Sequence, residues 1–112
     1  MPLTPAKLPP QTEDSFLRQV LELAAMHKWR TIHVRPARTK AGWVTPIQGY
    51  LCEGWPDVFL CRGHRLVCAE LKSEAGKVTP KQTAWLLALG GAGVEVFVWR
   101  PSDLEKIKEI LA

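Results

Sequence analysis

The first regular pattern along the chain is a set of apolar positions at helical spacing. Its members are Phe16, Leu17, Val20, Leu23 and Ala24, followed by His27. Steps of three and four residues place such positions on one face of a helix. Thr12 is suited to cap the helix N-terminus, and Glu13 and Asp14 put negative charge in the first turn, where the helix dipole favours it. We therefore expect a helix from Thr12 to about Lys28.

Strand patterns follow. Trp29–Arg35 alternates apolar and polar side chains, which predicts a first strand. Val58–Cys61 and Leu66–Leu71 are apolar runs joined by a polar turn at Arg62–Arg65, which predicts a β-hairpin. Val94–Trp99 is an almost continuous apolar run, which is typical of a strand buried on both faces rather than at an exposed edge.

Two more helices complete the predicted order. Thr79 and Pro80 form a helix start, because a missing N–H costs little at the first helical position, and this helix ends at Gly90–Gly91. Ser102–Glu105 has the spacing of a capping box and opens a last helix. The apolar side of that helix carries Leu104, Ile107, Ile110 and Leu111. The order αβββαβα predicts an α/β fold.

Two segments have no periodicity. Residues 1–11 contain four prolines and no apolar stretch of the kind that signal peptides have, and we expect a flexible tail before a single domain at residues 12–112. Pro36–Glu53 mixes cations with aromatic residues, a composition that suits contact with a nucleic-acid backbone and bases. A surface loop with Trp43 packed into the core is the alternative.

Composition narrows the classes of partner and compartment. The net charge of +4 is compatible with a polyanionic partner, although a solvated basic surface explains it equally well. No apolar stretch is long enough for a transmembrane helix, so no membrane contact is expected. The three cysteines form no C-x-x-C pair, and Cys61 and Cys68 lie in apolar runs. We expect buried free thiols and a reducing cytoplasm.

The candidate chemistry lies at the open end of the predicted hairpin. With the turn at residues 62–65, Asp57 lies opposite about position 70, so its carboxylate comes close to that of Glu70. Lys72 shares a strand face with Glu70, above an apolar floor of Leu66 and Cys68. Two carboxylates this close repel unless a proton or a cation lies between them.

Mg²⁺ is the expected occupant, with Mn²⁺ as a substitute, because it takes oxygen ligands beside a substrate phosphate. The backbone carbonyl of Leu71 would add one oxygen. Lys72 would orient or deprotonate the attacking water, or hold the phosphate as a point charge. The alternative is an ordinary surface ion pair between Lys72 and Glu70 or Asp57, which has little energetic value. Glu13, near the buried face of its helix, either joins the site or only favours the helix start. His33 is interpreted as an ordinary strand residue.

These residues resemble the VRR-NUC branch of the PD-(D/E)XK nuclease superfamily, most of all its small stand-alone phage and bacterial members. The similar segments are Gly54-Trp55-Pro56-Asp57, Ala69-Glu70-Leu71-Lys72-Ser73, Thr79-Pro80-Lys81-Gln82-x-x-Trp85-Leu86 and Val96-x-Val98-Trp99-Arg100-Pro101. The resemblance extends from about Glu13 to Leu111. Trp55 departs from the Phe that is frequent there, without changing the chemistry.

The resemblance implies a restriction-endonuclease-like αβββαβ core, with a central mixed sheet flanked by helices and a C-terminal helix. It implies that Asp57, Glu70 and Lys72 are catalytic, that Gln82 borders the site, and that Glu13 is the superfamily's early-helix carboxylate and a metal ligand. It also implies a Mg²⁺-dependent endonuclease that acts as a homodimer on branched DNA such as Holliday junctions.

Several basic residues and one tryptophan are expected to contact the DNA. The predicted DNA-binding residues are Arg35, Arg38, Lys40, Trp43, Lys77 and Lys81, with Arg62 and Arg65 as further cations in loops flanking the site. Each of these lysines and arginines could equally be a surface charge that only keeps the protein soluble. The rival functions are a non-catalytic DNA-binding scaffold of the same fold and a nuclease acting on flaps or RNA. A thiol-based enzyme is the least favoured, because no cysteine has an evident base partner.

Overall fold

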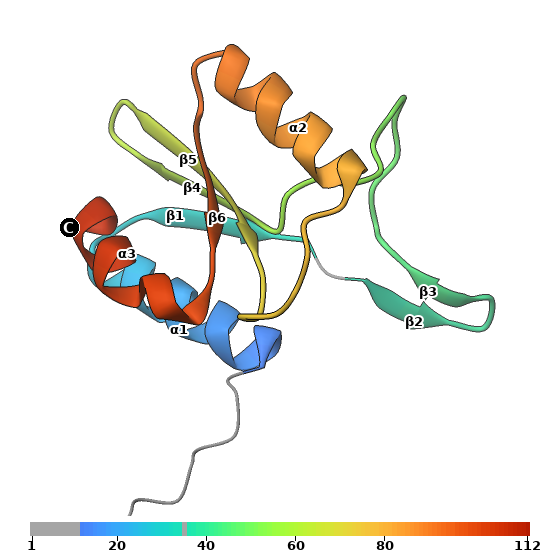
Figure 1. Ribbon diagram of the computed structural model, residues 1–112, viewed down its shortest axis with the longest axis horizontal. Coiled ribbons are helices and arrows are strands. Elements are labelled where there is room, and N and C mark those ends of the chain that lie inside the picture. The colour runs from blue at the N-terminus through green and yellow to red at the C-terminus, as the bar shows by residue number, and fades with distance from the viewer. Residues whose placement is uncertain (1–11, 35) are drawn as a thin grey trace, which may run out of the picture.

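The computed structural model describes residues 12–34 and 36–112, so the predicted tail at residues 1–11 and the predicted DNA contact Arg35 lie outside the described residues. The elements, in chain order, are α1 (Glu13–Met26), β1 (Arg30–His33), β2 (Ala37–Thr39), β3 (Gly42–Val44), β4 (Val58–Arg62), β5 (Arg65–Leu71), α2 (Pro80–Gly91), β6 (Glu95–Trp99), the 3₁₀ helix η1 (Pro101–Asp103) and α3 (Leu104–Leu111). The predicted α/β class, with its C-terminal helix, is confirmed (Figure 1).

The main sheet is mixed and has the strand order β1-β4-β5-β6. Strands β1, β4 and β5 pair antiparallel, while β6 pairs parallel to β5 after the crossover through α2. The prediction for the last strand was wrong in one respect, because β6 is an edge strand and only Trp99 is fully buried in it. Its apolar side chains are half-buried beneath the helices that flank the sheet, and this contact accounts for the continuous apolar run.

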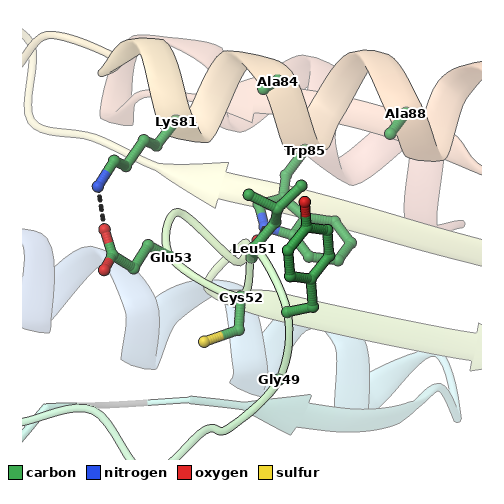
Figure 2. Close-up of a pocket in the computed structure, with 9 residues that line it drawn as sticks. Gly49, Leu51, Cys52, Glu53, Lys81, Ala84, Trp85 and Ala88 are labelled. Carbon is green, nitrogen blue, oxygen red and sulfur yellow. Dashed lines mark hydrogen bonds and ion pairs between the residues drawn. The ribbon is translucent and has the colours of Figure 1, made fainter.

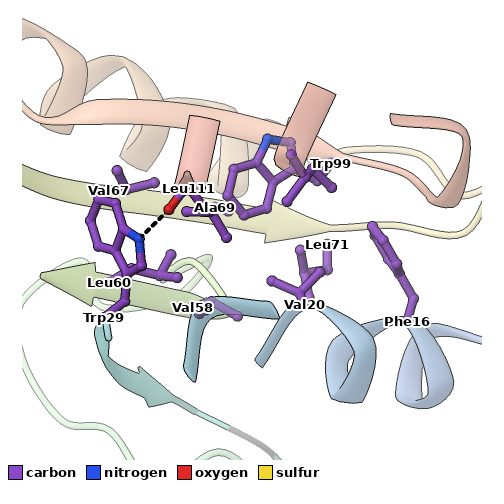
Figure 3. Close-up of a cluster of buried hydrophobic side chains, with 12 residues drawn as sticks. Phe16, Val20, Trp29, Val58, Leu60, Val67, Ala69, Leu71, Trp99 and Leu111 are labelled. Atoms are coloured by element: carbon purple, nitrogen blue, oxygen red, sulfur yellow. Dashed lines mark hydrogen bonds between the residues drawn. The ribbon is translucent and has the colours of Figure 1, made fainter. Parts of the chain in front are cut away.

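The hydrophobic core lies between one face of the sheet and the helices α1 and α3 (Figure 3). Alternation along β5 sends Val67, Ala69 and Leu71 into this core, and the buried face of α1 meets them. The core consists of Phe16, Val20, Ala24, Trp29, Val58, Leu60, Val67, Ala69, Leu71, Trp99, Ile107 and Leu111. The other face of β5 carries Cys68 and Glu70, and α2 lies on that side of the sheet.

Two arginines at the β4–β5 turn join the sheet to the C-terminal helix. Arg62 donates hydrogen bonds to the carbonyls of His27, Leu111 and Ala112, and its guanidinium lies 4.5 Å from the ring centroid of Trp29. Arg65 donates to both oxygens of Glu95 and to the carbonyl of Ile110. Both were predicted to flank the candidate site. That prediction was wrong, because the turn lies at the opposite end of the hairpin from Asp57.

The segment predicted to lack regular structure contains a small hairpin. Strands β2 and β3 pair antiparallel, and the turn between them is held by the Thr39 hydroxyl, which donates to the Gly42 carbonyl at 2.9 Å. This two-stranded hairpin projects away from the main sheet (Figure 1). Trp43 is 69 % exposed on it, so the alternative in which Trp43 packs into the core was wrong.

The start of the last helix also differs from the prediction. The expected capping box at Ser102 does not form, because the Ser102 N–H and hydroxyl both donate to Glu74. Asp103 instead accepts a hydrogen bond from the backbone N–H of Arg100 at 2.9 Å, at the start of η1. Within residues 12–34 and 36–112, no helix is both long and apolar enough to cross a lipid bilayer.

Candidate functional site

The β4–β5 hairpin brings Asp57 and Glu70 opposite each other, as predicted. Val58 pairs with Ala69, so the next positions outward are 57 and 70. One oxygen of the Asp57 carboxylate accepts a hydrogen bond from the backbone N–H of Leu71 at 2.8 Å, and the Asp57 carbonyl accepts one from Val34 at 3.1 Å. Asp57, directly before β4, is therefore held by hydrogen bonds from both neighbouring segments, Val34 after β1 and Leu71 at the end of β5.

Gly54 explains why this stretch lies against helix α2. Its φ is +87°, and a Cβ at this position would lie 2.5 Å from the backbone carbon of Lys81. Only glycine allows the chain to pass so close to the first turn of α2. The next residue, Trp55, stacks on Phe59 with ring centroids 4.8 Å apart and meets Trp85 edge-on at 4.7 Å. These contacts fix the approach to Asp57.

Glu70 is a buried carboxylate, only 2 % exposed, on the sheet face that α2 covers. One oxygen, Oε1, accepts a hydrogen bond from the Gln82 side chain at 2.9 Å and lies 3.7 Å from the Lys72 ammonium. The other, Oε2, is buried and has no hydrogen-bond partner among the described residues. A buried carboxylate oxygen without a partner is costly, so this atom points to a missing proton or cation.

The surroundings of Glu70 change its acidity. The pKa of Glu70 is raised to about 8. Burial is the largest cause, the negative charge of Asp57 is the second and the side-chain contact with Asp57 is the third, while the positive charge of Lys72 lowers the pKa. Burial and the same two carboxylates also raise the pKa of the Cys68 thiol, to about 12. Cys68 therefore keeps its proton at neutral pH, which disfavours a thiolate mechanism at this position. The prediction of a buried thiol was wrong for Cys61, which is exposed near the turn end of β4.

Two predicted site residues come from the elements that follow β5. Gln82 is the third residue of a capping box, so its side-chain oxygen accepts from the Thr79 N–H at 2.9 Å while its side-chain nitrogen donates to Glu70. The Lys72 side chain is 13 % exposed, and its backbone N–H donates to the Trp99 carbonyl at 2.9 Å. Glu70 is thus buried and Lys72 largely shielded from solvent, which does not fit the alternative of an ordinary surface ion pair.

The predicted apolar floor beneath Glu70 is only half correct. Cys68 is fully buried below it, but Leu66 is 41 % exposed. Leu66 lies next to the turn at residues 62–65, at the far end of β5 from Glu70.

Glu13 lies beside the carboxylate pair, at the start of α1. It lines a small cavity of about 110 Å³ together with Asp57 and the backbone region of Leu71. Its charge contributes the smallest of the effects that raise the pKa of Glu70. In the described part of the chain, no three His, Cys, Asp or Glu side chains come close enough together to hold a metal ion. The donors at the site are therefore two carboxylates, with the Leu71 carbonyl as the predicted third oxygen.

The loop between β5 and α2 is held by a residue to which the sequence reasoning gave no role. Arg100 donates from one guanidinium nitrogen to the carbonyls of Ser73 and Gly76, both at 2.6 Å, and more weakly to that of Glu74 at 3.3 Å. This loop connects Lys72 to the cap of α2. Arg100 belongs to the segment Val96-x-Val98-Trp99-Arg100-Pro101, one of those that resemble the nuclease family. No pattern in the sequence indicates that its partners are carbonyls of the loop at residues 73–76.

The described residues among the predicted DNA contacts lie in two places. Arg38, Lys40 and Trp43 are exposed on the β2–β3 hairpin. Lys77 is exposed in the loop before α2, and Lys81 is exposed on α2. The ammonium of Lys81 forms an ion pair with Glu53, a residue that the sequence reasoning did not select. The cations therefore come from segments before and after the Gly54–Asp57 stretch along the chain.

The fold and the site together define an α/β protein with a carboxylate pair and a buried lysine at the open end of a β-hairpin. Comparison with models of known protein families found no match, and comparison with curated protein sequences found no relative.

Proposed function

We propose that this protein is a Mg²⁺-dependent endonuclease that hydrolyses DNA phosphodiester bonds at the open end of the β4–β5 hairpin. The observation that carries the proposal is the buried Glu70 carboxylate, with one unpartnered oxygen and with Asp57 beside it. A structural ion pair would leave no such atom, because Lys72 and Gln82 both reach the other oxygen of Glu70.

The residues present fit a hard divalent cation. Asp57 and Glu70 would hold it, with the Leu71 carbonyl and, as the resemblance implies, Glu13 nearby; Mn²⁺ accepts the same oxygen ligands as Mg²⁺. When bound, the cation supplies neutralisation of the phosphate charge and a water of lowered pKa. Occupation of the site would also remove the repulsion between the two carboxylates.

The other side chains have defined tasks in this proposal. Lys72, half-buried beside Glu70, holds or deprotonates the attacking water, or stabilises charge that develops on the phosphate. Gln82 orients Glu70 by its hydrogen bond and is itself oriented by the cap of α2. The exposed cations on the β2–β3 hairpin, together with Lys77 and Lys81, contact phosphates, and each contact would steepen the salt dependence of binding.

Branched DNA is the proposed substrate and a homodimer the proposed assembly. Cutting two strands of a four-way junction requires two sites, whereas each chain has one carboxylate pair. A C2 dimer would supply the second site in a symmetric position. The cytoplasm is the proposed location, because Cys52, Cys61 and Cys68 are all free thiols. Light scattering of the purified protein tests the dimer.

The decisive experiment is a cleavage panel with a labelled four-way junction, a flap and a plain duplex, each with Mg²⁺, Mn²⁺ or EDTA. We expect metal-dependent cleavage of the branched substrates and a loss of roughly 10²–10⁴-fold in Asp57→Ala and Lys72→Ala, the range for groups that act on the reacting atoms. Lys108→Ala, which removes an exposed ion pair on α3, is the matched control.

Equal cleavage by Asp57→Ala and the parent would show that the site is misassigned. Tight binding of the junction without cleavage under any divalent metal would favour the scaffold function instead. RNA versions of the same substrates, run beside the DNA, decide which backbone is cut.

A further inference from the structure

A hollow larger than the cavity beside Glu13 lies along α2, next to the candidate site and outside it. It is a groove of about 640 Å³, here called the outer groove, between the loop at residues 49–53 and α2 (Figure 2). Its walls include Tyr50, Leu51 and Glu53 from the loop, and Lys81, Ala84 and Ala88 from the helix.

The outer groove presents apolar and aromatic surface that the fold leaves uncovered. Tyr50 is 92 % exposed and Leu51 is 72 % exposed, although both belong to a segment held in place by the rest of the structure. The indole N–H of Trp85 donates to the Leu51 carbonyl at 3.0 Å and so ties the loop to the helix. Helix α2 is predominantly apolar, yet none of its residues is buried. The groove is therefore pre-formed, and no side chain of residues 12–34 or 36–112 fills it.

The charge around the outer groove indicates which kind of partner it fits. Residues 36–52, which lead from the β2–β3 hairpin into the loop of the groove, contain Arg38 and Lys40 and no acidic residue, and residues 75–94 contain two lysines and no acidic residue. Glu53 is the acidic residue in the groove wall, and it forms an ion pair with Lys81. Two copies that docked through this face would bring like charges together, whereas a nucleic-acid strand would bring phosphates to the cations.

The position of the outer groove connects it to the carboxylate pair. Lys81, in its wall, directly precedes Gln82, which contacts Glu70. Gly54, one residue after the loop that forms the other wall, touches the backbone of Lys81 and leads to Asp57 within three residues. A strand that passes the carboxylate pair therefore comes alongside the groove.

We propose that the outer groove holds an unpaired nucleobase of the DNA strand, stacked on Tyr50, next to the phosphate that is cut. This inference rests on the proposed nuclease function and narrows its substrate: the preferred DNA has an unpaired nucleotide at its branch point, which a continuous duplex does not offer. Every base has a π-face, so recognition by Tyr50 tolerates any sequence. Lys81 is placed to contact the flanking phosphate.

The test uses the full chain in EDTA and a branched DNA that carries 2-aminopurine as the unpaired nucleotide at the branch, with a fully paired duplex as reference. Affinity is measured by anisotropy, and base stacking by the change in 2-aminopurine fluorescence. Tyr50→Ala removes the stacking ring, and Ala84→Met fills the groove. Leu87→Ala is the matched control, because Leu87 is equally apolar and exposed on α2 but does not line the groove.

We expect the parent and Leu87→Ala to alter the fluorescence and to bind the branched DNA alike. Tyr50→Ala and Ala84→Met should bind it roughly 5- to 150-fold more weakly, the range for loss of one base–aromatic stack of ~1–3 kcal/mol. Their affinity for the paired duplex should not change. An abasic nucleotide at the same position should weaken the parent equally, and Tyr50→Ala should then cause no further loss.

Unchanged affinity and unchanged fluorescence in both groove variants, with their fold verified by circular dichroism, would overturn the inference. A change in molar mass by light scattering in Ala84→Met would also overturn it and would assign the groove to protein association. Cleavage by the parent in Mg²⁺ is scored separately. Base stacking without cleavage would refute the proposed nuclease function and leave the base-binding role of the outer groove intact. Cleavage without base stacking would refute the base-binding role and leave the nuclease function intact.

Discussion

The two ends of the β4–β5 hairpin are built from the same strands but treat their charged groups in opposite ways. At the turn end, Arg62 and Arg65 donate to backbone carbonyls and to Glu95, and both lie over the ring of Trp29. At the open end, Glu70 is buried, and one of its oxygens has no hydrogen-bond partner in the described part of the chain. The turn end follows the rule that polar groups removed from water find partners, and the open end departs from it. Such departures concentrate where a ligand is bound.

The largest expected effect on the turn end follows from Arg62→Ala. Removing this guanidinium takes the Arg62 donor from the oxygens of His27 and Ala112, leaves the Leu111 carbonyl with the Trp29 indole as its donor, and ends the contact of Arg62 with the Trp29 ring. We expect a loss of about 2–3 kcal/mol in the free energy of unfolding, since each hydrogen bond to a charged group is worth roughly 1.5–3 kcal/mol when buried and less when exposed. Urea denaturation measures it, with Lys108→Ala as a near-neutral control.

If the turn end serves stability alone, Arg62→Ala should cleave DNA at the parent's rate at temperatures where it remains folded. If the cleavage rate of Arg62→Ala falls by more than its folded fraction does, the turn end also contributes to catalysis and the two ends do not have separate roles.

The next effect concerns Arg100. Like Arg62 at the turn end, it donates hydrogen bonds to backbone carbonyls, here in the loop that follows Lys72. We expect Arg100→Lys to lower kcat by roughly 10- to 100-fold, the range found when a group that orients the metal-binding residues is changed, because a single ammonium cannot reproduce the planar guanidinium contact with the carbonyls of Ser73 and Gly76. KM for DNA should stay constant. Steady-state cleavage rates across Mg²⁺ concentrations give both quantities.

A fall in DNA affinity with kcat unchanged would show instead that Arg100 contributes to binding and does not position the loop that follows Lys72. Arg100→Lys keeps the positive charge, so a fall in kcat reports the lost guanidinium geometry, and Lys108→Ala should leave both kcat and KM unchanged.

A further effect is a pH dependence of stability that comes from Glu70. Its pKa is raised to about 8 in the folded protein from a usual value of 4.5, so the folded state binds the extra proton. The stability that this proton brings is complete below pH 4.5 and is lost as the pH rises towards 8. Without divalent metal, Tm should therefore fall between pH 5 and pH 8.5, and Glu70→Gln should reduce that fall.

The matched variant for this titration is Glu105→Gln, which alters an exposed carboxylate on α3 and should leave the fall in Tm unchanged. If Glu70→Gln melts with the same pH profile as the parent, Glu70 is ionised across the whole range and the contrast between the two ends disappears. Addition of Mg²⁺ at pH 8 should raise the Tm of the parent and leave that of Glu70→Gln nearly constant.

The sequence was informative wherever interactions are local. The hairpin register that faces Asp57 with Glu70 depends on one short turn at Gly63 and on the alternation of two strands, and both can be counted along the chain. The caps of α1 and α2 depend on Thr12 and Thr79 and on residues three positions later. Hydrogen bonds over three residues and pairing across a tight turn depend on few conformational choices, so pattern alone determined them.

The sequence failed where partners lie far apart along the chain. Nothing near Ser102 indicates that Glu74 takes its hydrogen bonds, and nothing near Arg62 indicates that the end of α3 accepts from it. The position of β6 at the sheet edge likewise depends on how α2 crosses over. These contacts form only once the core is packed, because they join segments 28 to 50 residues apart.

The sequence by itself determined the α/β class, the hairpin and the pairing of Asp57 with Glu70, because these follow from period, turn length and strand alternation. Only the tertiary structure decided that Glu70 is buried with an oxygen unpartnered, that the basic residues near the turn stabilise the C-terminal helix, and that α2 and the loop at residues 49–53 enclose a groove. Burial and orphaned polar atoms depend on what other elements cover a position, and that coverage is a property of the packed molecule.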